Sequence, residues 1–192
     1  RTGGSIKIVN LVDKKHRNEM NTVTKKLNEL FIIKSTISHD KSALTDVTSE
    51  HDYPYITRTS ENNGISERTG LIDGISLNEE NTFSLGLLQM DFFFQSEKWY
   101  AGQFVRKVIP LFEIDKEIAL YFLAYFKYVK QILLKDLVRD VNDTFNNLEI
   151  KLPCKDDGET INYDYMREFI KEIEKDYSNK INLFLKSNYQ GK

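Results

Sequence analysis

A polar segment between residues 57 and 68 holds the side chains best suited to reading hydrogen-bond patterns. Guanidinium and carboxamide groups can make paired hydrogen bonds with the edge of a nucleic-acid base, and hydroxyl groups can contact phosphates. The candidates for base contacts and then for phosphate contacts are Arg58, Asn62, Asn63 and Arg68, followed by Thr57, Thr59 and Ser60. This composition predicts a binding surface.

A second group of candidate contacts comes later in the chain and combines cations with an aromatic ring. It consists of Lys98, Trp99, Arg106 and Lys107. These four residues form one patch only if the strands that carry them lie alongside each other.

The alternative for the first segment is an ordinary hairpin. Asn63-Gly64 is a strong turn signal because both residues tolerate positive φ. Asn62 and Asn63 are therefore explained equally well by turn geometry and by DNA contact. Arg58 and Arg68 are stronger candidates for binding, since a turn does not require arginine.

Motifs that would indicate catalysis are absent from the sequence. It contains no nucleophile elbow, phosphate-binding loop, dinucleotide fingerprint or paired-cysteine zinc pattern, and no Asn-Pro-Pro-Tyr motif of adenine methyltransferases. Asp91, Glu97 and Lys98 only loosely resemble a nuclease set, because adjacent strand residues point to opposite faces. We expect a non-catalytic protein that binds no cofactor and no metal.

The composition indicates a folded protein without a strong overall charge. The 192 residues are 40% hydrophobic and carry a net charge of −2. Residues 72–97 hold five acidic and no basic side chains, whereas residues 98–139 hold eight basic and four acidic ones. Such blocks either create a basic face for phosphates or simply solvate the surface.

Cysteine content and hydropathy limit the location of the protein. Cys154 is the single cysteine, which excludes an internal disulfide and fits a reducing, cytoplasmic compartment. The longest apolar run, Ile118–Phe126, has nine residues, whereas a membrane-spanning helix needs about 20. We therefore expect no membrane association.

The periodicity predicts a mixed α/β fold with a twisted, largely antiparallel sheet, a packed helix and a long C-terminal helix. Residues 18–30 are expected to form a helix or a loop, residues 115–136 the packed helix, and residues 143–147 a turn or one helical turn. The expected strands are 6–12, 30–37, 53–57, 74–78, 83–90, 104–110, 137–141 and 149–152. Phe92–Phe94 are expected to belong mainly to the core.

The C-terminal helix is expected to begin after Asn162, which can cap it. Its apolar residues recur at a spacing close to the 3.5-residue repeat of paired helices. They are Met166, Ile170, Ile173, Tyr177, Ile181 and Phe184. This seam predicts either pairing with a helix outside the domain, or a helix that folds back onto its own domain.

Ordered motifs along the chain resemble those of one family. Residues 53–66 read YPYITRTSENNGIS, residues 30–36 read LFIIKST, and residues 150–153 read IKLP. Asp157-Gly158 and the string YDYM at residues 163–166 follow. The set spans roughly residues 27–175 and resembles the target recognition domain of DNA specificity (S) subunits in type I restriction-modification systems, especially those linked to fused nuclease-methyltransferases.

The resemblance implies three segments and a set of partners. Residues 1–153 would form the DNA target recognition domain, with residues 1–5 as a flexible leader. Residues 154–160 would be a linker, and residues 161–188 a dimerisation or spacer helix. The implied partners are double-stranded DNA, a DNA methyltransferase subunit and a restriction endonuclease subunit. Through the C-terminal helix, the chain would also pair with a second copy of itself, as a homodimer, or with a second recognition domain. Residues 74–82 also resemble a strand motif of the family. In the family glycines usually follow the asparagine of this motif, whereas acidic and polar residues follow Asn78 here.

Two alternatives stay open on the sequence alone. The chain could be a piece of a longer fused nuclease-methyltransferase, where the same domain would read DNA. It could also be an assembly domain that binds proteins through its C-terminal helix and does not bind DNA.

Overall fold

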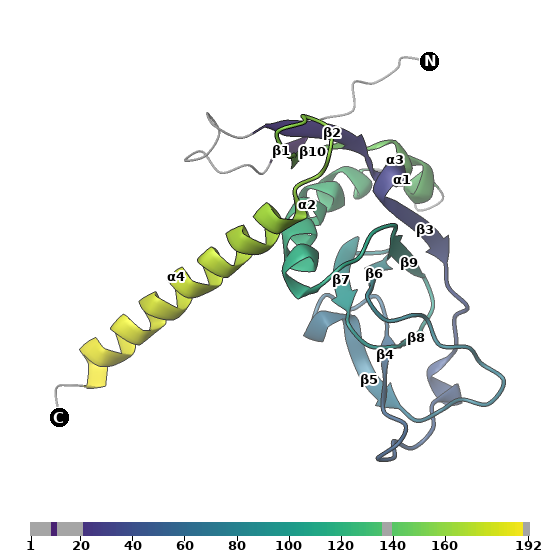
Figure 1. Ribbon diagram of the computed structural model, residues 1–192. Helices are drawn as coiled ribbons and strands as arrows, with labels where there is room; N and C mark the ends of the chain where they lie inside the picture. Colours follow the sequence, from purple (N-terminus) through teal and green to yellow (C-terminus); the bar gives the residue numbers. More distant parts are fainter. Residues whose placement is uncertain (1–8, 11–20, 136–139, 190–192) are drawn as a thin grey trace.

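The computed structural model describes residues 9–10, 21–135 and 140–189 (Figure 1). One of its sheets pairs strands from the beginning of the chain with a strand that follows α3 (Val141–Asn147). It pairs β1 (Val9–Asn10), β10 (Glu149–Pro153) and β2 (Thr22–Lys26) in that order. The expected leader at residues 1–5 lies outside the described residues.

A four-stranded antiparallel sheet forms the centre of the domain. Its strands, in spatial order, are β3 (Phe31–Ser35), β9 (Val105–Pro110), β6 (Thr82–Gly86) and β7 (Asp91–Gln95). Strand β6 is buried on both faces. Phe83 and Leu85 contribute to the main core, while Thr82 and Ser84 alternate with them and so face the opposite side.

A third sheet of three strands contains the YPYI motif. Its strands are β5 (Ile65–Thr69), β4 (Tyr53–Ile56) and β8 (Tyr100–Ala101). A side-chain hydrogen bond links it to the central sheet. The indole Nε1 of Trp99, next to β8, donates to Thr82 Oγ1 of β6 at 3.1 Å. Within the central sheet, Gln95 Nε2 of β7 donates to Ser84 Oγ of β6 at 3.0 Å. These hydrogen bonds satisfy the buried hydroxyl groups of β6.

The described helices are α1 (Leu27–Leu30), α2 (Lys116–Leu133), α3 (Val141–Asn147) and α4 (Tyr163–Tyr189), with short 3-10 turns η1 (Lys41–Ala43) and η2 (Asn62–Gly64). Helices α2 and α3 pack on the central sheet, and the start of α4 packs on α2. Asp115 caps α2 through its Oδ1, which accepts from the amide of Ile118 at 2.9 Å. Asn162 caps α4 in the same way, with Tyr165 as the donor at 3.0 Å.

The main core lies between α2 and the central sheet and is rich in aromatic rings. Phe31 of β3 makes edge contacts with Phe83, Phe122 and Phe126 at centroid distances of 5.1–6.0 Å. Phe92 stacks on Phe126 at 4.4 Å. Edge and offset ring contacts add to the stabilisation from burial.

The mixed α/β fold, the packed helix and the long C-terminal helix are confirmed. Several expectations were wrong in detail. The expected strand 83–90 ends at Gly86, and residues 87–90 form the turn that leads into β7. The strands form three sheets, residues 18–30 contain a strand before the single turn α1, and residues 74–78 contain only an isolated bridge between Asn78 and Trp99. The expected strand 137–141 lies largely outside the described residues, and Val141 begins α3.

Candidate nucleic-acid interface

Three loops converge at one end of the central sheet. The backbone of Arg58 lies against Gly86, where an added Cβ would be 3.1 Å from the Arg58 Cα. The amide of Leu87 donates to the carbonyl of Phe104 at 2.9 Å. We call this region the loop end, and its exposed side chains are those of Arg58, Leu88, Gln89, Gln103 and Phe104.

Arg58 and Phe104 form the most distinctive contact of the loop end. The guanidinium carbon of Arg58 lies 5.0 Å from the centroid of the Phe104 ring. Such a cation–π contact stabilises by about 0.5–1 kcal/mol at an exposed site. No carboxylate among the described residues pairs with Arg58, so its N–H donors are available to a ligand.

Backbone strain is concentrated at the loop end. Phe104 has a φ of 60° and Met90 a φ of 54°. The left-handed region costs an L-residue other than glycine about 1–2 kcal/mol, and asparagine tolerates it best. The other non-glycine residues with positive φ are asparagines. Strain of this kind is found at sites whose conformation serves binding or catalysis.

The rest of the predicted polar segment leaves the loop end and covers the edge strand β7. Ser60 donates to Asp91, and the side-chain amide of Asn63 donates to the carbonyl of Phe94 at 3.0 Å. Because a strand rises about 3.4 Å per residue, these two contacts are about 10 Å apart along β7. An edge covered in this way is protected from pairing with another chain.

The asparagines of this segment are used by the turn. Asn62, Asn63 and Gly64 all have positive φ, between 47° and 79°. The Asn62 side chain donates to the carbonyl of Ile65 at 3.0 Å, and the Oγ1 of Thr59 accepts from the amide of Glu61 at 3.2 Å. The Asn62 carboxamide is therefore used within the turn, and the Asn63 carboxamide attaches the turn to β7. Thr57 lies at the start of the segment, beside the loop end.

Arg68 has two acidic partners and lies away from Arg58. Its guanidinium donates to both carboxylate oxygens of Glu97, at 3.1 and 2.9 Å, and also pairs with Asp52. The hydrogen bonds that Arg68 donates to Glu97 and Asp52 raise the pKa of its guanidinium. This arrangement ties β5 to the turn after β7 and occupies the donors that base contact would need.

The structure does not unite the second predicted patch. Trp99 is 0% exposed and is therefore part of the core, so its prediction as a DNA contact is corrected. Lys107 pairs with Glu79, and Arg106 projects from the opposite face of β9. The Nε of Arg106 is buried and has no hydrogen-bond partner among the described residues. Lys98 is exposed on the turn after β7.

Sequence reasoning missed Leu88, Gln89, Gln103 and Phe104. Gly102 indicates a turn, but the sequence does not show whether the phenylalanine after it is exposed or buried. The unusual φ of Phe104 follows from the path between β8 and β9, which only the tertiary structure defines.

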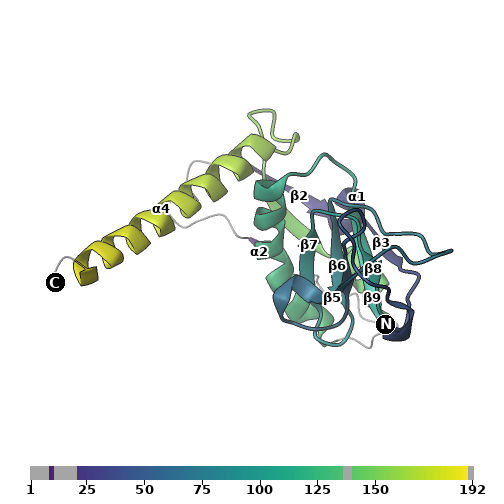
Figure 2. The same ribbon diagram turned by 90° about the horizontal axis from the view of Figure 1, so that it is seen from below.

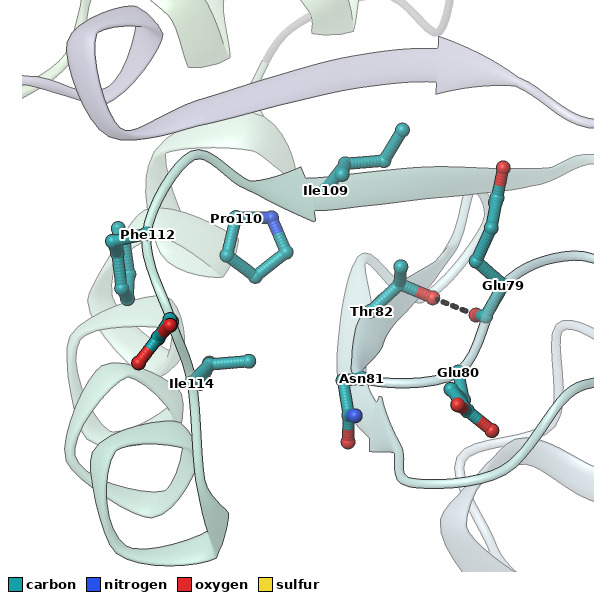
Figure 3. A pocket seen from close by; sticks show the side chains of 9 residues that line it. Glu79, Glu80, Asn81, Thr82, Ile109, Pro110, Phe112 and Ile114 are labelled. Carbon is teal, nitrogen blue, oxygen red and sulfur yellow. Dashed lines mark hydrogen bonds between the residues drawn. The ribbon is translucent and has the colours of Figure 1, made fainter.

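The opposite end of the central sheet carries an acidic pocket of about 490 Å³ (Figure 3). Its lining consists of Glu79, Glu80, Asn81, Thr82, Ile109, Pro110, Phe112, Glu113 and Ile114, and we call this region the pocket end. A tight turn forms here without the family's glycines: Asn81 takes a φ of 56°, and Thr82 Oγ1 donates to the Glu79 carbonyl at 2.8 Å. The hydrogen bond from Lys107 lowers the pKa of Glu79. Ionised carboxylates at this end repel phosphate groups.

Helix α4 extends away from the sheets in both views of the molecule (Figures 1 and 2). Only the start of its predicted seam packs on the domain, since Met166 is 0% and Ile170 9% exposed. Every residue from 171 to 185 is exposed. The later seam residues are uncovered by the domain, namely Ile173, Tyr177, Ile181 and Phe184. The helix therefore does not fold back onto its own domain beyond its second turn.

Ion pairs anchor the first half of α4 to α2. Arg167 pairs with Asp115, the cap of α2, and with Asp164 at 2.8 Å. Lys116 pairs with Glu174 at 2.9 Å. Burial alone would raise the pKa of Asp115, but the Ile118 amide and the Arg167 guanidinium together hold it below its usual value.

Comparison with known proteins fits this architecture to one family. The type I restriction modification DNA specificity domain matches residues 19–183. The chain belongs to that family. No curated protein sequence matches the chain. Within the described part of this specificity domain, none of the helices is both long and apolar enough to cross a membrane.

Solved structures share the fold of this specificity domain at low sequence identity. The HsdS subunit from Thermoanaerobacter tengcongensis is 12% identical, with a TM-score of 0.56 over 88% of this chain and 40% of that one. The type I restriction-modification S subunit from M. genitalium is 17% identical, with a TM-score of 0.53 over 90% of this chain and 46% of that one. The chain thus spans less than half the length of these subunits.

Proposed function

We propose that this specificity domain binds double-stranded DNA at a specific site and directs methyltransferase and endonuclease subunits to it. The family match over residues 19–183 carries the proposal. The loop end supports it, because Arg58 has no salt-bridge partner within the described ranges and lies near the exposed carboxamides of Gln89 and Gln103. The acidic pocket end would face away from the duplex, where its carboxylates do not oppose the phosphates.

The chain's role in this proposal is recognition without catalysis. Methyl transfer and any cleavage would belong to the partner subunits. Of the residues predicted from sequence, Thr57 and Arg58 are the best candidates for DNA contact, with Thr59 and Ser60 next to them. Lys98 follows Gln95, whose strand partner Thr82 lines the pocket end, so it is a weaker candidate. Arg68 and the asparagines have roles within the fold that compete with base contact.

Binding of a randomised duplex pool tests the DNA function. The chain is titrated alone and with a candidate methyltransferase subunit, at several salt concentrations. We expect a short half-site to be enriched and the affinity to fall as salt rises, since phosphate contacts release counterions. Absence of enrichment in every condition would contradict DNA reading and leave an assembly role through α4 as the better account.

We also propose that two copies of the chain pair through α4. The exposed seam residues Ile173, Tyr177, Ile181 and Phe184 lie within about 80° of one another around the helix, at 100° per residue. Two copies would restore roughly the length of the S subunits that the chain resembles, and a symmetric pair would give each α4 the same partner surface.

Sedimentation of matched variants tests this pairing. Ile181→Asp places a charge in the seam and is expected to convert a dimer to a monomer without loss of helix content. Asn182→Asp adds the same charge on the opposite side of α4 and is expected to leave the dimer intact. A wild-type chain that sediments as a monomer at all concentrations would contradict the pairing of two copies.

A further inference from the structure

We propose that Arg58 and Phe104 form one guanine-reading unit: the ring of Phe104 fixes the Arg58 guanidinium, and the guanidinium donates two hydrogen bonds to a guanine in the major groove. This inference rests on the proposed DNA function and names the base and residues that would provide part of its specificity.

The chemistry of the pair suits this base. A guanidinium presents two parallel N–H donors, and guanine offers the O6 and N7 acceptors side by side in the major groove. Arginine side chains are usually mobile in solution. Contact with the Phe104 ring, 5.0 Å from the guanidinium carbon, restricts Arg58 before DNA binds. A restricted side chain loses less conformational entropy when it makes its hydrogen bonds.

The availability of Arg58 distinguishes it from neighbouring cations. Arg68 is held by Glu97 and Asp52, Lys107 by Glu79, and Lys130 by Asp91. Within the described ranges, no acidic side chain forms a salt bridge with Arg58. The Arg58 contact with an aromatic ring orients the cation without neutralising it.

The conformation of Phe104 is the second, independent observation. Phe104 is 55% exposed, so burial stabilises its large side chain only weakly. Its φ of 60° favours glycine, which would fit there without strain. The strained backbone nevertheless carries an exposed ring under a guanidinium, which is the arrangement expected where a conformation serves binding.

The surroundings of the pair also fit a groove-facing surface. Leu88 is exposed on the adjoining turn, and Gln89 follows it. An aliphatic group can contact a thymine methyl group, and a carboxamide can pair with adenine. Gln103 is already engaged, since it donates to Asp40 at 2.9 Å. The Arg58–Phe104 pair is therefore the best-defined base contact of the loop end.

Half-site selection from a randomised duplex pool, with the methyltransferase subunit present, tests the inference. Arg58→Ala is expected to reduce discrimination at one G·C position by about 10- to 100-fold and to leave the other positions unchanged. Phe104→Gly should weaken discrimination at that same position by several-fold. Lys98→Ala, which removes an exposed cation near the pocket end, is the control and is expected to change neither the motif nor the affinity appreciably.

Thermal unfolding of the same variants separates recognition from folding. Phe104→Gly is expected to be at least as stable as the wild-type chain, because glycine relieves the left-handed strain. Evenly lowered affinity with an unchanged motif in Arg58→Ala would overturn the inference and assign Arg58 to a phosphate. Unchanged guanine preference in Phe104→Gly would overturn the role of the ring. A wild-type chain that selects no motif would instead remove the DNA function on which the inference rests.

Discussion

The loop end and the pocket end are the two ends of the same four-stranded sheet, yet they hold opposite kinds of surface. The loop end carries the exposed Phe104 and Arg58, which forms no salt bridge with any acidic side chain that the structure describes. The pocket end carries three glutamates, and its lysine, Lys107, is already paired with Glu79. Strands β6 and β9 run between them, so one rigid sheet holds both ends.

The two ends also treat strained backbone differently. At the pocket end the left-handed residue is Asn81, a residue type that tolerates this conformation. At the loop end the left-handed residues are Met90 and Phe104, which do not. Turn geometry explains Asn81, and burial in the main core explains Met90. The exposed Phe104 is explained by neither, and the proposed binding role accounts for it.

The largest expected contrast is in the free energy of unfolding, between a variant of the buried Trp99 and a variant of the exposed Phe104. Trp99→Ala is expected to lower the free energy of unfolding by about 3–5 kcal/mol, because the ring is fully buried and its Nε1 donates to Thr82. Phe104→Ala is expected to cost less than about 1 kcal/mol, since its ring is largely exposed. Urea unfolding of both variants measures the difference, and equal losses would show that Phe104 supports the fold as Trp99 does.

A smaller contrast concerns charge and DNA affinity. Arg58→Glu places a negative charge at the loop end and is expected to weaken binding more than about tenfold. Glu80→Lys at the pocket end is expected to change affinity less than about threefold. The length of β6, about 14 Å at 3.4 Å per residue, exceeds the screening length of about 8 Å at physiological salt. A binding titration in which Glu80→Lys has the larger effect would indicate that the duplex contacts the pocket end and not the loop end.

The smallest contrast concerns pH and the ion pairs beside the pocket end. The pKa of Asp115 is lowered in the folded chain, so the charged form stabilises the fold above the ordinary value of 3.8, and this contribution disappears as pH falls through the lowered value. Asp115→Asn keeps a capping oxygen but loses the charge beside Arg167. Because the pair is about a third exposed, we expect a loss of about 1 kcal/mol or less at pH 7.

Unfolding of wild-type and Asp115→Asn chains at several pH values checks this sign. The difference between their unfolding free energies should shrink as the pH is lowered below about 4. The loop-end variant Arg58→Ala serves as the control, and its stability difference should not follow the same pH dependence. A constant difference for Asp115→Asn would indicate that the ion pair with Arg167 contributes nothing.

Much of the fold could be predicted because local signals were strong. Asp115 and Asn162 marked the starts of α2 and α4, and the spacing of apolar residues in α2 matched its buried face. Strand β2 was not predicted, because residues 22–26 are short and polar, and their pairing partner β10 is more than a hundred residues away in the sequence. Non-local pairing of this kind leaves little local pattern.

The candidate site was predicted only in part. Arg58 was identified because no turn requires arginine, whereas Trp99 was assigned to the wrong environment and Phe104 was missed. The sequence did not show that Arg68 is neutralised, because its partners Asp52 and Glu97 come from distant segments. Which cations are neutralised depends on contacts across the fold.

The sequence by itself determined the family, the mixed α/β class, the caps of the long helices and the apolar seam of α4. Those features depend on residues that are near one another along the chain. Only the tertiary structure decided that Met166 and Ile170 are covered while Tyr177 and Ile181 are not, and that Arg58 lies over Phe104. These outcomes depend on where the domain surface ends and on how three loops meet, and both are set by strand pairings between distant residues.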